Sequence, residues 1–125
     1  MRHCLIVDDS EIIRRVAKKV LEDMHMTSTE AETADEALEN CKRAMPDFIL
    51  LDWHMPQMSS HDFLVALRHA PGGDLPVVIY CTTDNDAQDI ARARKNGASE
   101  ILMKPFDRES LERKLHRAGI GAMAD

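Results

Sequence analysis

Five short strand candidates, all but one of them apolar and separated by stretches with helical periodicity, restrict the fold more than any other feature of this sequence. Most of them are apolar at every position, which is typical of strands that are covered on both faces. Such strands occur in parallel sheets, whose connecting helices pack on the two sides. The segments are Cys4–Val7, Thr27–Ala31 (the weakest), Phe48–Leu51, Val77–Cys81 and Ile101–Met103.

The stretches between these segments carry helix signals. Ser10, Thr33 and Asp107 are N-cap candidates, because each precedes apolar residues at helical spacing. The first helix is expected to bury one apolar stripe, which consists of Ile12, Ile13, Val16, Ala17, Val20, Leu21 and Met24.

The order of the strands follows from the handedness of their connections. Strand–helix–strand crossovers are right-handed, so helices reach both faces only if the sheet is wound outward in both directions from an early strand. The expected fold is α/β and flavodoxin-like, a doubly wound (βα)5 parallel sheet with strand order 2-1-3-4-5. Residues 1–118 would form this single domain, and residues 119–125 a flexible tail.

The acidic balance of the chain narrows its partners. It has 22 Asp and Glu against 16 Lys and Arg, a formal net charge of −6. This argues against nucleic acid as a partner, since phosphate contacts need a basic face. No apolar run approaches the roughly 18 residues that span a bilayer, and no signal-peptide pattern is present, so a cytoplasmic location is expected. The cysteines lack metal-ligand spacing and are interpreted as small buried side chains, namely Cys4, Cys41 and Cys81.

Polar residues follow four of the five apolar segments. Asp8 and Asp9 follow the first, Asp52 the third, Thr82 the fourth and Lys104 the fifth. Ligand sites of such sheets lie beyond the carboxyl ends of the strands, where these side chains would meet. Three neighbouring carboxylates repel one another unless a cation compensates, and Mg²⁺ suits one or two carboxylates plus water. One carboxylate could then act as a nucleophile toward a phosphoryl group.

Short motifs in family order then identify a resemblance. The chain resembles receiver domains of two-component response regulators, most closely the stand-alone CheY-like type, over roughly Cys4–Ala118. The motifs are LIVDDS (Leu5–Ser10), LLDWHMPQM (Leu50–Met58), CTT (Cys81–Thr83), NGAS (Asn96–Ser99) and MKPF (Met103–Phe106).

The resemblance implies a phosphorylation site with a metal ion. Asp52 would accept the phosphoryl group from a phosphohistidine of a histidine kinase. Asp9 would bind Mg²⁺ directly, and Asp8 largely through metal-bound water. His54 would contribute its backbone carbonyl to the metal.

The same resemblance assigns the groups around the phosphoryl. Thr82 would be the switch hydroxyl, chosen over Thr83 because it lies 22 residues before Lys104 (104 − 82), a spacing like that of the family. Lys104 would pair with a phosphoryl oxygen. Pro105 would follow a cis peptide bond.

Three positions depart from the family pattern. Ser60 stands where most members have a glycine after the Met-Pro pair. Thr83 stands where the residue after the switch hydroxyl is usually small. Ile101 replaces the aromatic residue that many relatives carry three positions before the lysine, so output would be relayed by Thr82 and loop movement instead.

The implied output is altered protein binding by a monomer or weak dimer. The target protein is unknown. It would dock on a face of this domain that combines the fourth helix (Ala87–Ala91), the fifth strand (Ile101–Met103) and the fifth helix (Leu111–Leu115). Alternatives are a phosphate sink and a phosphorylation-independent interaction module. A flavodoxin-like cofactor module is disfavoured by the acidic loop after the first strand, and a metal-dependent phosphatase by His54, where those enzymes usually have a second acid.

Overall fold

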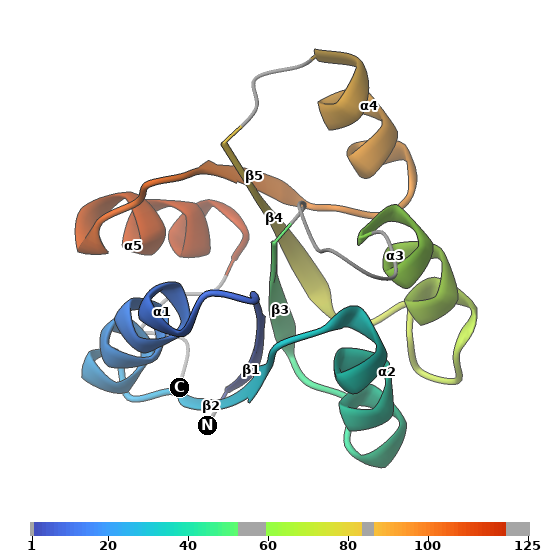
Figure 1. The fold of residues 1–125 in the computed structure, drawn as a ribbon, viewed down its shortest axis with the longest axis horizontal. Helices are drawn as coiled ribbons and strands as arrows, with labels where there is room; N and C mark the ends of the chain where they lie inside the picture. Colours follow the sequence, from blue (N-terminus) through green and yellow to red (C-terminus); the bar gives the residue numbers. More distant parts are fainter. Residues whose placement is uncertain (1, 53–59, 84–86, 120–125) are drawn as a thin grey trace.

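Strands and helices alternate along the chain (Figure 1). The computed structural model describes residues 2–52, 60–83 and 87–119, and these contain five strands and five helices. The strands are β1 (His3–Val7), β2 (Thr27–Ala31), β3 (Phe48–Asp52), β4 (Val77–Thr82) and β5 (Glu100–Met103). The helices are α1 (Glu11–Asp23), α2 (Ala34–Arg43), α3 (Ser60–His69), α4 (Ala87–Lys95) and α5 (Arg108–Arg117).

All five strands form one parallel sheet in the order β2-β1-β3-β4-β5. The predicted flavodoxin-like fold and strand order are therefore confirmed. In the strand register Val7 lies beside Leu51, Asp52 beside Cys81, and Thr82 beside Met103. The carboxyl ends of β1, β3, β4 and β5 consequently meet at one edge of the sheet.

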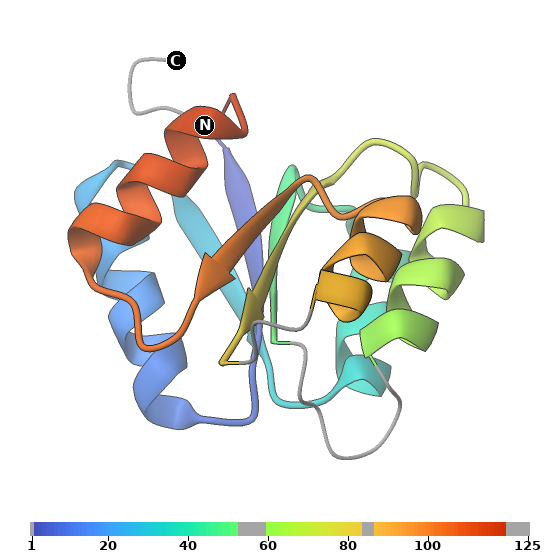
Figure 2. The same ribbon diagram turned by 90° about the horizontal axis from the view of Figure 1, so that it is seen from above.

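The sheet separates two packed layers (Figure 2). Helices α1 and α5 cover one face, and α2, α3 and α4 cover the other. Successive residues of a strand point to opposite faces, so Cys4 and Ile6 join the core under α1 and α5, whereas Leu5 and Val7 join the other core. All three cysteines are free and buried, as predicted.

The N-caps predicted at Ser10, Thr33 and Asp107 are present. The Ser10 hydroxyl accepts from the Ile13 backbone N–H at 3.3 Å, and the Thr33 hydroxyl accepts from the Glu36 N–H at 3.1 Å. Asp107 accepts from the Ser110 N–H at 2.8 Å. These bonds satisfy backbone donors that a helix leaves unpaired in its first turn.

The apolar stripe predicted for α1 was partly wrong. Ala17, Val20 and Leu21 are buried, but Ile12 is 71% exposed and Val16 38% exposed. Arg14, which is only 7% exposed, faces inward instead. It shares the helix face of Ala17 and Leu21, three and seven residues further on. The buried side of α1 is therefore rotated away from Ile12 and includes a charged residue.

Arg68 in α3 links two connections on the layer of α2, α3 and α4. Its Nη1 donates to the Gly73 carbonyl at 2.9 Å and to the Pro76 carbonyl at 2.8 Å, and its Nη2 donates to the Gly97 carbonyl. A Cβ at Gly97 would lie 2.5 Å from Arg68 Nε, and the φ of Gly97 is +108°. A side chain at position 97 would thus be strained and would displace the guanidinium.

Among the residues that the structure describes, no helix has the length and apolar character needed to cross a membrane.

Candidate functional site

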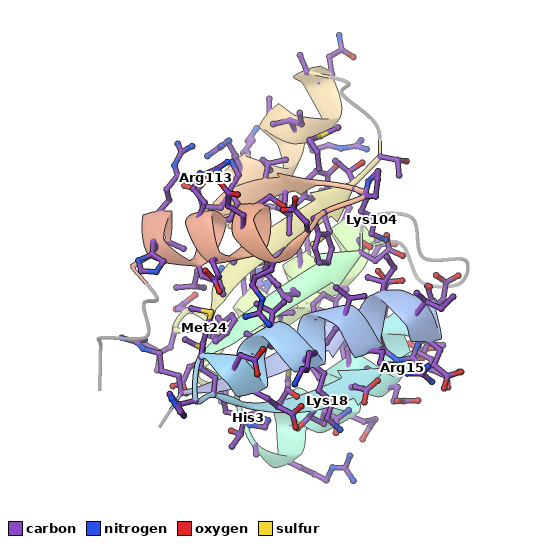
Figure 3. The ribbon with its side chains drawn as sticks, turned by 90° about the vertical axis from the view of Figure 1, so that its left-hand side faces the viewer. His3, Arg15, Lys18, Met24, Lys104 and Arg113 are labelled. Carbon is purple, nitrogen blue, oxygen red and sulfur yellow. The ribbon has the colours of Figure 1, made fainter. Side chains whose placement is uncertain are left out.

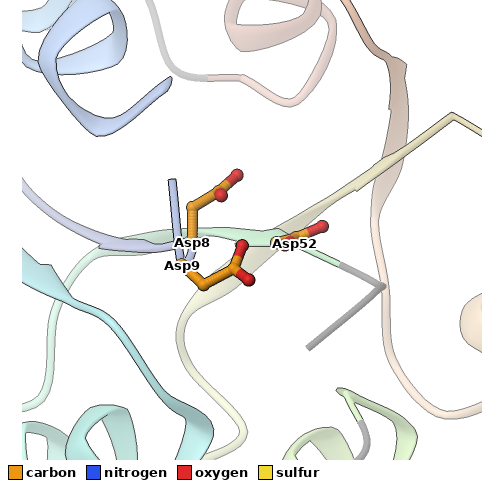
Figure 4. Close-up of side chains that lie close together, drawn as sticks. All are labelled: Asp8, Asp9 and Asp52. Carbon is orange, nitrogen blue, oxygen red and sulfur yellow. The ribbon is translucent and has the colours of Figure 1, made fainter. Parts of the chain in front are cut away.

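Three carboxylates gather where β1 and β3 end (Figure 4). Asp8 and Asp9 follow β1, and Asp52 is the last residue of β3. Each offers a carboxylate oxygen, and these oxygens lie within 4.8 Å of one another. Asp8 and Asp52 are each 3% exposed, whereas Asp9 is exposed. Two of the acids therefore lie inside the protein and the third at the surface.

The ammonium group of Lys104, the residue that follows β5, completes the cluster. Lys104 Nζ lies 2.7 Å from Asp8 Oδ2 and 3.0 Å from Asp52 Oδ1, at the carboxyl end of the sheet (Figure 3). Burial acts to lower the pKa of Lys104, but the hydrogen bonds and charges of Asp8 and Asp52 outweigh it and raise the pKa. The ammonium is thus retained at neutral pH. The peptide bond between Lys104 and Pro105 is cis.

The charges of this cluster do not balance. Three carboxylates and one ammonium leave two negative charges at the edge of the sheet. A divalent cation would cancel them, and carboxylate oxygens are the donors that the hard cation Mg²⁺ prefers. The residues present therefore fit a magnesium ion.

Backbone contacts fix Asp8 from several sides. Its N–H donates to the Ala31 carbonyl at 3.1 Å, and its Oδ1 accepts from the Ser10 N–H at 2.9 Å. Its carbonyl accepts from Arg14 Nη1 at 2.7 Å. Asp52 is held similarly, since the buried Ser60 hydroxyl donates to the Asp52 carbonyl. Hydrogen bonds from both neighbouring helices thus reach the two buried acids.

The end of β4 lies beside this cluster. Thr82 is fully buried and its carbonyl accepts from the Lys104 N–H at 2.9 Å, whereas Thr83 is exposed. The strand register places Cys81 beside Asp52. Burial raises the pKa of the Cys81 thiol to about 12, so this cysteine stays protonated near neutral pH and is a poor nucleophile.

The structure brings Asp8, Asp9, Asp52 and Lys104 together, and it places Thr82 at the end of the adjoining strand. His54, whose carbonyl is the fourth expected metal ligand, lies outside the described residues, as do the rest of residues 53–59 and residues 120–125 of the expected tail.

Sequence reasoning missed two contributors to this site. Arg14 occupies a position within the buried stripe of α1, and an arginine at such a position signals a buried anionic or carbonyl partner. Ser60 stands out in the sequence only as a departure from the family glycine, without a predicted contact. Its hydroxyl bond to the Asp52 carbonyl depends on how α3 docks, which no local pattern reveals.

The fold and the acidic cluster define the class of this chain. It belongs to the response regulator receiver domain family, whose model matches residues 4–116. The chain is therefore a receiver domain of a two-component response regulator. Members of this class act as phosphorylation-dependent switches, and phosphorylation with Mg²⁺ is typical of the family.

Individual relatives support this assignment. The structure of the chemotaxis response regulator CheY4 of Vibrio cholerae superposes with a TM-score of 0.89 at 30% identity, covering 94% of this chain and 98% of that chain. The phosphate regulon transcriptional regulatory protein PhoB is 36% identical in Klebsiella pneumoniae and 35% in Escherichia coli K12, each over 111 residues. These matches cover 88% of this chain and 48% of each PhoB protein, so the chain spans about half the length of these curated relatives.

Proposed function

We propose that this receiver domain is switched by transfer of a phosphoryl group from a histidine kinase to Asp52. One observation carries the proposal: the buried Asp52 carboxylate shares Lys104 with Asp8, within reach of a third carboxylate. A salt bridge built only for stability needs one acid for its lysine. Extra acids at the same point add repulsion, which is useful when a cation binds there and, with Lys104, attracts an anionic phosphoryl group.

The metal-binding groups would be the side chains of Asp8, Asp9 and Asp52 with the backbone carbonyl of His54. Asp9, the exposed acid, is the proposed direct ligand, and the buried Asp8 would act largely through water. Once bound, Mg²⁺ would offset negative charge on the oxygens of the transferred phosphoryl.

The chemical step needs little from the protein beyond position and charge. A carboxylate oxygen of Asp52 forms a bond to phosphorus while the phosphorus–nitrogen bond of the phosphohistidine breaks, and the leaving imidazole takes a proton from solvent. Lys104 would turn from the carboxylates to a phosphoryl oxygen, and the Thr82 hydroxyl would follow that group. The domain would act on itself and would turn over no external substrate.

The proposed output is altered binding of a target protein at the face of α4, β5 and α5. Ile101, which replaces the usual aromatic residue, is only 8% exposed and packs in the core. Thr82 and the neighbouring loop would therefore relay the change. The domain would work alone, as a monomer or weak dimer in the cytoplasm.

Two alternatives keep the domain but change its use. As a phosphate sink it would take phosphoryl groups from a kinase without a target of its own. As an interaction module it would bind its partner without phosphorylation. Binding of the partner equally well to wild type and Asp52→Asn would favour the second.

The deciding experiment uses Trp53, the sole tryptophan, which follows Asp52 directly in the sequence. Mg²⁺ is titrated while tryptophan fluorescence is recorded, and then beryllofluoride or a small phosphodonor is added. We expect a saturable response to Mg²⁺ and a further response to the donor, both altered in Asp52→Asn. Mass spectrometry should find one added phosphoryl on wild type only. Phosphorylation that persists in Asp52→Asn would exclude Asp52 as the acceptor.

A further inference from the structure

Arg14 is an arginine that α1 turns into the protein. Its side chain is 9% exposed. Nη1 donates to the main-chain carbonyl of Asp8 at 2.7 Å, and Nε donates to Glu30 Oε1 at 3.0 Å. Nη2 lies 3.8 Å from Glu32 Oε1. One guanidinium therefore joins helix α1, the end of strand β1 and the acids at the end of strand β2.

Packing alone does not explain a charged group at this position. An apolar side chain would fill the α1 stripe without the desolvation cost of a guanidinium. The partners of Arg14 also differ in their burial and in whether a second cation lies close to them. Glu30 is partly exposed and has Lys18 within 4.0 Å as a second cation, whereas the Asp8 carbonyl bond is buried. The contact that requires Arg14 is thus the one with Asp8.

That contact bears directly on the acidic site. The Asp8 N–H is tied to the Ala31 carbonyl at 3.1 Å, so the arginine fixes the other polar group of the same residue's backbone. With both its N–H and its carbonyl bonded, the backbone that carries the Asp8 side chain and leads into Asp9 is held in place. Mg²⁺ demands near-ideal octahedral geometry, so small displacements of its ligands weaken binding.

We propose that Arg14 is a positioning residue of the acidic site, held in place by Glu30, and that it sets Mg²⁺ affinity through the Asp8 carbonyl. The inference rests on the proposed function only in taking Mg²⁺ as the bound ion.

An effect of the charge of Arg14 and an effect of its contact with Asp8 change Mg²⁺ affinity in opposite directions, so the direction of the change distinguishes them. If Arg14 acted only as a nearby positive charge, its removal would leave the site more negative and would tighten Mg²⁺ binding. If it acts by position, its removal loosens the Asp8–Asp9 backbone and weakens binding. If the substitution only lowers the stability of the protein, Mg²⁺ affinity should not change, as long as the chain remains folded during the titration.

The experiment measures the Mg²⁺ dissociation constant by Trp53 fluorescence in wild type, Arg14→Met and Arg14→Lys. The matched control is Arg15→Met, since Arg15 lies on the solvent side of α1 and pairs with Glu11, one helical turn earlier, at 3.0 Å (Figure 3). Urea unfolding in EDTA records stability separately. For Arg14→Met we expect about tenfold weaker binding, the usual effect of removing a residue that orients a metal ligand. Arg14→Lys, which keeps the charge and one donor, should lie between Arg14→Met and wild type.

A second variant keeps the inference testable if Arg14→Met does not fold. Glu30→Gln retains the arginine but removes its charged anchor, and we expect a smaller weakening, about threefold, in line with partial loss of a ligand's support. Glu11→Gln, which removes the same charge from an acid that pairs with Arg15, is the control for charge and should bind Mg²⁺ more tightly than Glu30→Gln. Binding by Arg14→Met, or by Glu30→Gln if that must stand in, that equals or exceeds wild-type affinity would overturn the proposal and leave the proposed function standing. A wild-type protein without any Mg²⁺ response would instead overturn the proposed function, and the role of Arg14 with it.

Discussion

Replacing Asp9 with asparagine should stabilise the metal-free protein. Two unit charges 4.8 Å apart, the outer limit for oxygens of this cluster, repel by about 0.9 kcal/mol in water and about 3.5 kcal/mol at an effective dielectric constant near 20. The carboxylate of Asp9 is repelled by two others, those of Asp8 and Asp52, and the positive charge of Lys104 cancels roughly one of these two repulsions. Because Asp9 is exposed, its repulsion energy should be closer to the value in water than to the value at a dielectric constant of about 20. Asp9→Asn should therefore raise the free energy of unfolding by about 1–2 kcal/mol.

The same substitution should abolish the response to Mg²⁺. At a concentration 100 times its dissociation constant, a bound ion stabilises the native state by about 2.7 kcal/mol, which wild type should show and Asp9→Asn should lose. Urea unfolding in EDTA, and again with MgCl₂ or with NaCl at equal ionic strength, measures both effects. Glu22→Gln, at an exposed acid on α1, is the matched control and should keep the metal response. An Asp9→Asn protein that is no more stable than wild type in EDTA would refute the electrostatic reasoning.

Three further outcomes are expected. Ile12→Ser, at an exposed apolar residue in the first turn of α1, should slow phosphotransfer from a histidine kinase about tenfold, as loss of an apolar docking contact would. Its phosphorylation by a small donor, measured by mass spectrometry, should stay unchanged. Arg68→Met should lower the urea-derived free energy of unfolding by about 2–4 kcal/mol, because three carbonyls lose charged donors, and should leave Mg²⁺ affinity at the wild-type value. Arg108 lowers the pKa of Asp23 below 3.8, so stability from this ion pair is present above that pH and is lost as the pH falls through the lowered pKa; thermal unfolding of Asp23→Asn should show a smaller acid-induced decline than wild type.

The sequence allowed the fold and the meeting of the acids to be predicted because both follow from topology. Once the apolar segments were taken as parallel strands, the ends of β1, β3 and β5 had to meet at one edge, and Asp8, Asp52 and Lys104 came with them. The same winding rule, outward in both directions from an early strand, placed the weak strand Thr27–Ala31 beside β1.

The details that failed depend on how elements dock against one another. Periodicity marks the apolar side of α1, but it does not fix the rotation of the helix, so Ile12 was predicted buried and is exposed. The role of Arg14 was missed because hydropathy alone assigns an arginine to the surface, whereas its long side chain reaches carbonyl and carboxylate partners from within the buried stripe of α1. The bond from Ser60 to the Asp52 carbonyl likewise joins two elements whose distance the sequence does not give.

The division of the sheet into two layers has a consequence for how such a domain can diverge. The side chains of Asp8 and Asp52 lie above the core formed with α1 and α5, where Ile6 and Leu50 support them. The layer of α2, α3 and α4 packs mainly against the opposite side of the sheet. Substitutions on the outer surfaces of α2 and α3 can therefore change which partners bind while the acidic site keeps its geometry.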